Sequence, residues 1–232
     1  MKNLVAFLLI LSLTARANAQ RVVDVDKENV SAAQFFNSVA GEPVVMAKFV
    51  KLVEGSPFYK NEWLVGEIEL ESGQIFKNLS LKINLYDDDV HYKDDKDREM
   101  IATMPIRTIR MRNVMGDTIE FAYAKTEVQK GLERGWYHVL HLDSVTLYKK
   151  YKKEISEDKP YGSATTEQRM RTREVFYVGF KGAFTEIKKI TDPIPAFAAH
   201  KTAIAEFMKS LSHQSHELKL VALVQYMNRL IK

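Results

Sequence analysis

The sequence contains no cysteine. This absence excludes disulfide bonds, thiolate metal sites and cysteine nucleophiles. The fold must therefore be held together by packing alone. The chain of 232 residues is long enough for that, because a domain of about 200 residues buries roughly 70% of the surface that its unfolded chain exposes.

Long apolar runs are also missing, with one short exception at the N-terminus. A run of ten residues, Leu4 to Leu13, follows Lys2 and precedes Ala17, Asn18 and Ala19. A positive end, a short apolar run and small residues at the cleavage positions are typical of a secretory signal peptide. We therefore expect residues 1–19 to be removed on export to the periplasm or the exterior.

An uncut membrane anchor is the alternative for residues 1–19, but ten residues are too few to cross about 30 Å of hydrocarbon as a helix. No cysteine follows the run, so a lipid anchor on cysteine is excluded. No second apolar run of spanning length occurs, and we expect no integral membrane span.

The chain has little net charge. The formal charge of the whole sequence is +4, and loss of Lys2 and Arg16 with residues 1–19 lowers it to +2. A nearly neutral protein has little electrostatic reason to bind nucleic acid, so we expect no nucleic-acid partner.

Period-two alternation dominates residues 44–190. Leu64, Ile68 and Leu70 alternate with charged residues, a Ser72–Gly73 turn follows, and the next segment alternates again. Short strands with one apolar face and no intervening helices favour an antiparallel sheet. We expect a mainly β fold, built as an antiparallel meander, sandwich or open barrel.

Apolar residues recur at helical spacing after Pro195. Two such segments, separated by residues 212–215, predict a C-terminal helical hairpin over 196–232 that packs on the sheet as part of the same globule. The β-rich domain then covers residues 20–195. Residues 153–174 are polar and weakly periodic, so we interpret them as a long surface loop between strands.

No catalytic motif is present. The sequence lacks the HExxH, EF-hand and G-x-S-x-G patterns. We therefore expect no catalytic residue, no metal site and no cofactor. Scattered serines such as Ser56 and Ser163 could still join a triad in space, but turn serines are the simpler interpretation.

Three polar groups have a functional and a structural interpretation. Asp87–Asp89 and Asp94–Asp97 could supply calcium ligands, although aspartate is also common in turns. His138 and His141 lie three apart on an expected strand, so they point to opposite faces and do not suit one zinc ion. The row of Glu67, Glu69 and Glu71 could hold a glycosidase-like pair, but it fits a solvated sheet face better.

Four aromatic side chains are the candidate ligand-binding residues. They are Tyr59, Trp63, Trp136 and Tyr137. Exposed rings of this kind stack on sugars or grip a peptide, whereas buried ones belong to the core.

Glycine, aromatic and alternating apolar residues form a set of motifs at Gly55–Phe58, Glu62–Trp63, Gly66, Ser72–Gly73, Phe76–Asn78, Leu81–Tyr86 and Tyr226–Asn228. As a set, these motifs resemble a family of uncharacterised exported proteins that is numerous in Bacteroidota. The resemblance extends from about Gly41 to the last helix. The resemblance implies an exported protein of the bacterial envelope, but no activity and no site residue.

The sequence therefore favours a non-catalytic binding or structural protein whose partner is an envelope protein or a glycan. Two alternatives remain open. The first is a hydrolase that acts on envelope or glycan material through scattered residues, and the second is a carrier of lipid or another envelope component. The sequence does not predict the oligomeric state of the chain.

Overall fold

The computed structural model describes residues 22–23, 41–43, 50–125, 129–162, 164–190 and 194–231. The expected signal peptide over residues 1–19, and Ser163, lie outside these ranges.

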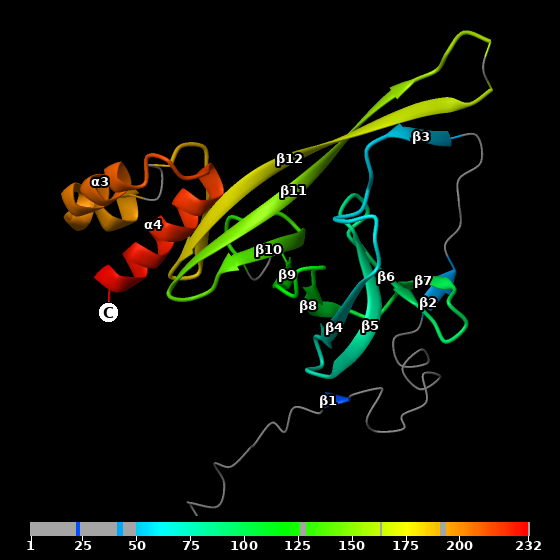
Figure 1. Ribbon diagram of the computed structural model, residues 1–232, viewed down its shortest axis with the longest axis horizontal. Helices are drawn as coiled ribbons and strands as arrows, with labels where there is room; N and C mark the ends of the chain where they lie inside the picture. Colours follow the sequence, from blue (N-terminus) through cyan, green and yellow to red (C-terminus); the bar gives the residue numbers. More distant parts are fainter. Residues whose placement is uncertain are drawn as a thin grey trace, which may run out of the picture.

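The thirteen strands in the described ranges belong to one sheet (Figure 1). Its order is β13-β12-β11-β10-β9-β8-β4-β5-β6-β7-β2, with β1 paired to β5 and β3 paired to β12. All neighbours are antiparallel except the β1–β5 and β3–β12 pairs, which are parallel. The bounds are β1 Val22–Val23, β2 Gly41–Pro43, β3 Val50–Glu54, β4 Leu64–Leu70, β5 Ile75–Asn84, β6 Asp89–Lys93, β7 Glu99–Ala102, β8 Ile106–Arg112, β9 Thr118–Ala124, β10 Gly135–His141, β11 Val145–Asp158, β12 Thr166–Phe180 and β13 Ala183–Ile187.

The helical hairpin expected at the C-terminus is confirmed. A 3-10 helix, η1 (Ile194–His200), leads into α3 (Lys201–Ser210), and α4 (His216–Leu230) follows. The side chain of Ser215 caps α4 by accepting a hydrogen bond from the Leu218 backbone N–H at 3.3 Å. None of the helices in the described ranges has the length and apolarity needed to cross a membrane.

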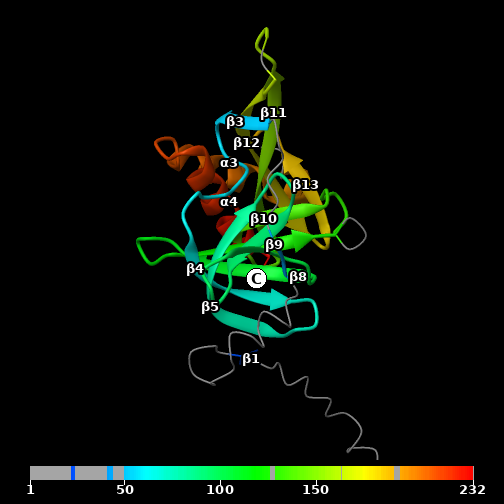
Figure 2. The ribbon, with the colours of Figure 1, turned by 90° about the vertical axis from the view of Figure 1, so that its right-hand side faces the viewer.

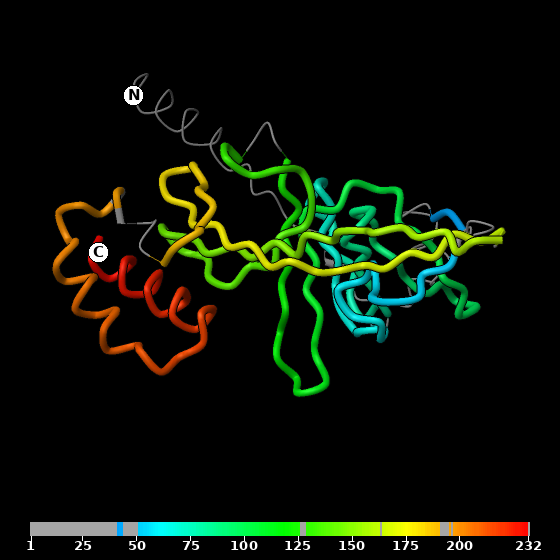
Figure 3. The backbone as a smooth tube through the Cα atoms, turned by 90° about the horizontal axis from the view of Figure 1, so that it is seen from above, coloured from blue at the N-terminus to red at the C-terminus, as the bar shows by residue number. Residues whose placement is uncertain are grey.

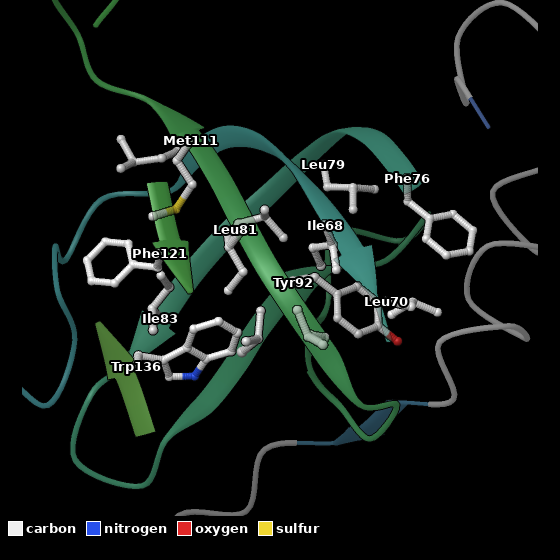
Figure 4. Close-up of a cluster of buried hydrophobic side chains, with 14 of the residues drawn as sticks. Ile68, Leu70, Phe76, Leu79, Leu81, Ile83, Tyr92, Met111, Phe121 and Trp136 are labelled. Atoms are coloured by element: carbon white, nitrogen blue, oxygen red, sulfur yellow. The ribbon is translucent and has the colours of Figure 1, made fainter. Parts of the chain in front are cut away.

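The strands β4 to β9 curve around the largest apolar cluster (Figure 4). Alternate residues of β5, including Leu79, Leu81 and Ile83, point into this cluster, as the period-two pattern predicts. Trp136 reaches the same cluster from β10.

The strands β10 and β13 and the inner parts of β11 and β12 are covered on both faces. On one face, Val145 and Leu147 of β11 pack against Leu220 and Val224 of α4. On the other face, Tyr148 packs in a second cluster that includes Tyr137. This double cover explains why five successive residues at the start of β11 are buried.

The prediction of a long loop over residues 153–174 is wrong. The strands β11 and β12 pair without interruption from Val145↔Phe180 to Asp158↔Glu167, so most of this stretch is a two-stranded arm. The arm points away from the helices (Figures 1 to 3). Because both faces of its outer part are largely exposed, no apolar alternation marked it as strand.

The prediction that Glu67, Glu69 and Glu71 lie on a solvated sheet face is only partly correct. Glu69 is 6% exposed, forms an ion pair with Arg107 and accepts a hydrogen bond from Thr108 Oγ1 at 3.0 Å. Register shifts on both sides of Glu69 break the strict alternation of β4.

Candidate ligand-binding pocket

A pocket of about 250 Å³ with a mixed polar and apolar lining opens beside the indole of Trp136. Three acidic side chains, one guanidinium group and two aromatic rings line it together with smaller and aliphatic residues. The lining residues are Glu71, Asp88, Asp89, Val90, Ala102, Thr103, Met104, Pro105, Ile106, Tyr123, Arg134 and Trp136.

The turn between β5 and β6 places the first carboxylate. Asn84 Oδ1 accepts hydrogen bonds from the backbone N–H groups of Tyr86 (3.0 Å) and Asp87 (3.1 Å). Asn84 Nδ2 donates to Asp87 Oδ2 at 2.8 Å. The next residue, Asp88, has a left-handed φ of 63°, a conformation that aspartate tolerates better than most residues.

Residues at the start of β10 contact Asp88 in the turn between β5 and β6. Trp136 Nε1 donates to the backbone oxygen of Asp88 at 3.0 Å. Gly135 has a φ of 129°, and a Cβ atom there would lie 2.7 Å from Asp88 Oδ1. Only glycine allows β10 to approach the carboxylate so closely.

Tyr123 and Arg134 also line the pocket. Arg134 Nε donates to Tyr123 Oη at 2.7 Å, and the Tyr123 ring meets the Trp136 ring edge to face at a centroid distance of 4.9 Å. These contacts hold a hydrogen-bonding group and an apolar ring surface side by side at the pocket.

Burial is the main reason why the pKa values of both Asp88 and Asp89 are raised. Lys150, a hydrogen bond from the Trp136 backbone and Arg134 oppose the rise at Asp88, whereas the neighbouring Asp87 adds to the rise at Asp89. The third acidic lining residue, Glu71, forms an ion pair with Lys125. Two partly desolvated carboxyl groups therefore face the pocket, and each gains from a ligand that donates hydrogen bonds.

We expect Gly135→Ala to displace Asp88 and to destabilise the protein by about 1–3 kcal/mol, because the new Cβ is strained and collides with the carboxylate. Urea unfolding measures this loss. Gly73 has a φ of 85° with open space around it, so Gly73→Ala keeps the strain but lacks the collision. Equal losses for the two variants would contradict the role given to the close approach.

The four candidate aromatic residues do not form one site. Trp136 lines the pocket and is 3% exposed, whereas Tyr137, which is 0% exposed, points into the cluster on the opposite face of β10. Tyr59 is half-buried against Phe121, with the ring centroids 4.9 Å apart. Trp63 lies elsewhere, beneath the ammonium of Lys82 at 4.5 Å from its ring centroid.

Comparison of the chain with family models, with curated proteins and with solved structures found no match.

The other polar groups serve as turns and core contacts in the described ranges. Asp94 Oδ1 accepts the backbone N–H groups of Lys96 and Arg98, both at 2.9 Å. His138 Nδ1 lies 3.2 Å from Tyr151 Oη and the imidazole stacks on that ring. Within the described part of the chain, no group of three or more histidine or acidic residues could hold a metal ion.

Sequence reasoning missed most of the pocket. It treated Asp88 and Asp89 as parts of a turn or a calcium site, and it did not single out Tyr123 or Arg134. Gly135 was a usable signal, because a glycine within a strand often marks a bulge or a close approach of another group to the backbone.

Proposed function

We propose that this chain is an exported, non-catalytic protein that binds a small hydroxylated ligand, a terminal sugar unit of an envelope glycan, in the pocket beside Trp136. The observation that carries the proposal is the joint presence of partly desolvated carboxyl groups, a guanidinium group and aromatic rings around one cavity.

The size of the pocket supports a ligand of about one ring. Its volume of about 250 Å³ lies below the range of roughly 300–1,000 Å³ that is usual for drug-sized ligands. Its small volume and its charged side chains also give no support to the alternative of a lipid carrier, because an acyl chain requires a larger and wholly apolar cavity.

The chemistry of the lining suits a sugar. Carboxylates at Asp88 and Asp89 accept hydrogen bonds from hydroxyl groups, and Arg134 can donate to a ring or carbonyl oxygen. The ring of Tyr123 supplies apolar surface for the C–H face of the ligand, and the largely buried Trp136 ring packs edge to face against it.

Export is part of the same proposal. It rests on the secretory pattern of residues 1–19 and on the resemblance to exported proteins of Bacteroidota. An envelope location would bring the pocket into contact with surface glycans.

A hydrolase is the second candidate, and one observation favours it. Carboxyl groups with raised pKa values in a pocket are the kind of groups that act as general acids. Asp88 would then donate a proton to a leaving group, and the pocket would turn over its ligand instead of only holding it.

Calorimetric titration with a panel of monosaccharides and reducing-end-capped disaccharides tests the binding proposal. We expect Asp88→Asn to weaken binding at least about tenfold, because it removes a charge-assisted acceptor worth about 1.5–3 kcal/mol. Asparagine tolerates the left-handed backbone at this position, so the turn should survive.

Asp95→Asn, in an exposed turn, is the matched control and should leave the affinity unchanged. Absence of binding across the whole panel would refute the proposal. Hydrolysis of the capped disaccharides that Asp88→Asn abolishes would replace it with the hydrolase.

A further inference from the structure

The outer part of β11 has an open edge. Among the described strands, β10 pairs with β11 only at Leu147–Lys149, while β12 occupies the other edge throughout. From Lys150 to Asp158 the structure describes no second strand partner for β11. By contrast, β12 is covered at the same end of the arm by β3.

Proteins usually protect an open edge with proline, a bulge or a projecting lysine. Residues 145–158 contain no proline, and the β11–β12 register runs without a shift along the whole arm. Two of the three common forms of protection are therefore absent from this edge.

The lysine side chains of this edge form ion pairs and hydrogen bonds within their own chain. Lys152 Nζ lies 2.9 Å and Lys150 Nζ 3.7 Å from the carboxylate of Glu133. Lys153 Nζ donates to the backbone oxygen of Phe58 and to Thr172 Oγ1, both at 3.0 Å. With these contacts made, the charges repel an approaching strand less than free lysines would.

We propose that this edge pairs antiparallel with the same edge of a second copy of the chain, which forms a two-fold symmetric dimer with Ile155 on the axis. Each arm would add its β11 to the β11 of the other copy and so continue the ladder across the interface. The outer part of the arm projects from the body (Figure 1), which leaves that part of the edge accessible to a second copy, while Lys152 and Lys153 nearer its base contact Glu133 and Phe58.

The charge pattern selects both the partner and the register. With Ile155 opposite Ile155, Lys153 faces Glu157 of the second copy, Lys152 faces its Asp158 and Glu154 faces its Ser156. Each of the two lysine–acid pairs occurs twice by symmetry, and no two like charges face each other. Lys153 has three N–H donors, and two of them have partners among the described residues.

Neighbouring registers of the symmetric β11–β11 pair place like charges opposite each other. A two-fold axis at Lys153, Glu154 or Glu157 places that charge opposite its own copy, and an axis at Ser156 places Glu154 opposite Asp158. Like charges directly opposite each other destabilise a strand pair. The single register without such a clash is the one centred on Ile155. In this register the charge pattern of β11 is complementary to that of a second copy of β11.

Sedimentation velocity of the chain that begins at residue 20, over a range of concentrations, tests the proposal. Because a ladder of about six residues a side is a small interface, we expect a dimer that dissociates in the micromolar range. The double variant Glu157→Lys with Asp158→Lys should weaken the dimer at least about tenfold, since it creates four like-charge pairs. Glu62→Lys with Glu206→Lys changes the net charge equally at exposed positions off the edge, and should dimerise normally.

A second variant, Lys152→Glu with Lys153→Glu, should also be monomeric alone. Its mixture with the Glu157→Lys, Asp158→Lys chain should form a heterodimer, because the two altered edges are complementary. Far-UV circular dichroism and melting curves show whether the β11–β12 arm of each variant is still folded. A chain that stays monomeric at high concentration, or a dimer that the double lysine variant leaves intact, would overturn the proposal.

Discussion

Replacing Asn228 with alanine is expected to lower the free energy of unfolding by about 3 kcal/mol, because it leaves buried backbone groups without partners. Asn228 lies on α4 and is 3% exposed. Its Oδ1 accepts the backbone N–H of Val145 at 2.8 Å, and its Nδ2 donates to the oxygens of Val145 (2.8 Å) and Val224 (3.1 Å). One amide thus joins the last helix to the first residue of β11.

Urea unfolding measures this effect, with Gln225→Ala as the control on an exposed face of the same helix. The control should change the free energy of unfolding by no more than about 0.5 kcal/mol. If Asn228→Ala lost less than about 1 kcal/mol, the amide would not be what ties α4 to the sheet.

Acidification should destabilise the protein through His138. Burial lowers the pKa of this imidazole to about 4, and the nearby Glu217 opposes the shift. Between the unfolded pKa of about 6.5 and the folded value, the unfolded chain binds a proton that the folded chain does not. The contribution of His138 is therefore complete above pH 6.5 and is lost as the pH falls towards 4.

The expected loss from His138 is about 2 kcal/mol between pH 7.5 and pH 5.0. His138→Phe should remove this loss, because phenylalanine can occupy the stacked position between Phe121 and Tyr151 without titrating. The measurement is the difference in unfolding free energy between the unaltered chain and the variant at each pH, so that titrations common to both cancel.

His213→Phe, at an exposed position, is the control and should keep the full pH dependence. A parallel pH profile for the unaltered chain and His138→Phe would show that the buried imidazole does not govern acid stability.

Regular alternation made the first half of the fold predictable. In β5, every second residue from Leu79 to Ile83 is apolar and buried, so the strand and its dry face follow from the spacing alone. The C-terminal helices were predictable for the same reason. Their helical periodicity and the capping serine at position 215 are both local properties of the chain.

The arm was not predictable in this way. Residues such as Glu154 and Arg173 form an ion pair across it at 3.2 Å, with polar side chains on both faces. Strand pairing there depends on hydrogen bonds to a partner strand, and those bonds leave no apolar period in the sequence. The prediction of a solvent-facing carboxylate at Glu69 failed for a different reason. Register shifts around Glu69 turn its side chain inward.

The sequence by itself determined the β-rich class, the helical hairpin and the absence of cysteine chemistry, because these depend on composition and on short-range periodicity. Tertiary structure alone decided the pocket, since Asp88, Tyr123 and Trp136 come from different strands and turns and meet only when the sheet curves. It also decided which aromatic side chains line the pocket, because adjacent residues such as Trp136 and Tyr137 point to opposite faces of one strand.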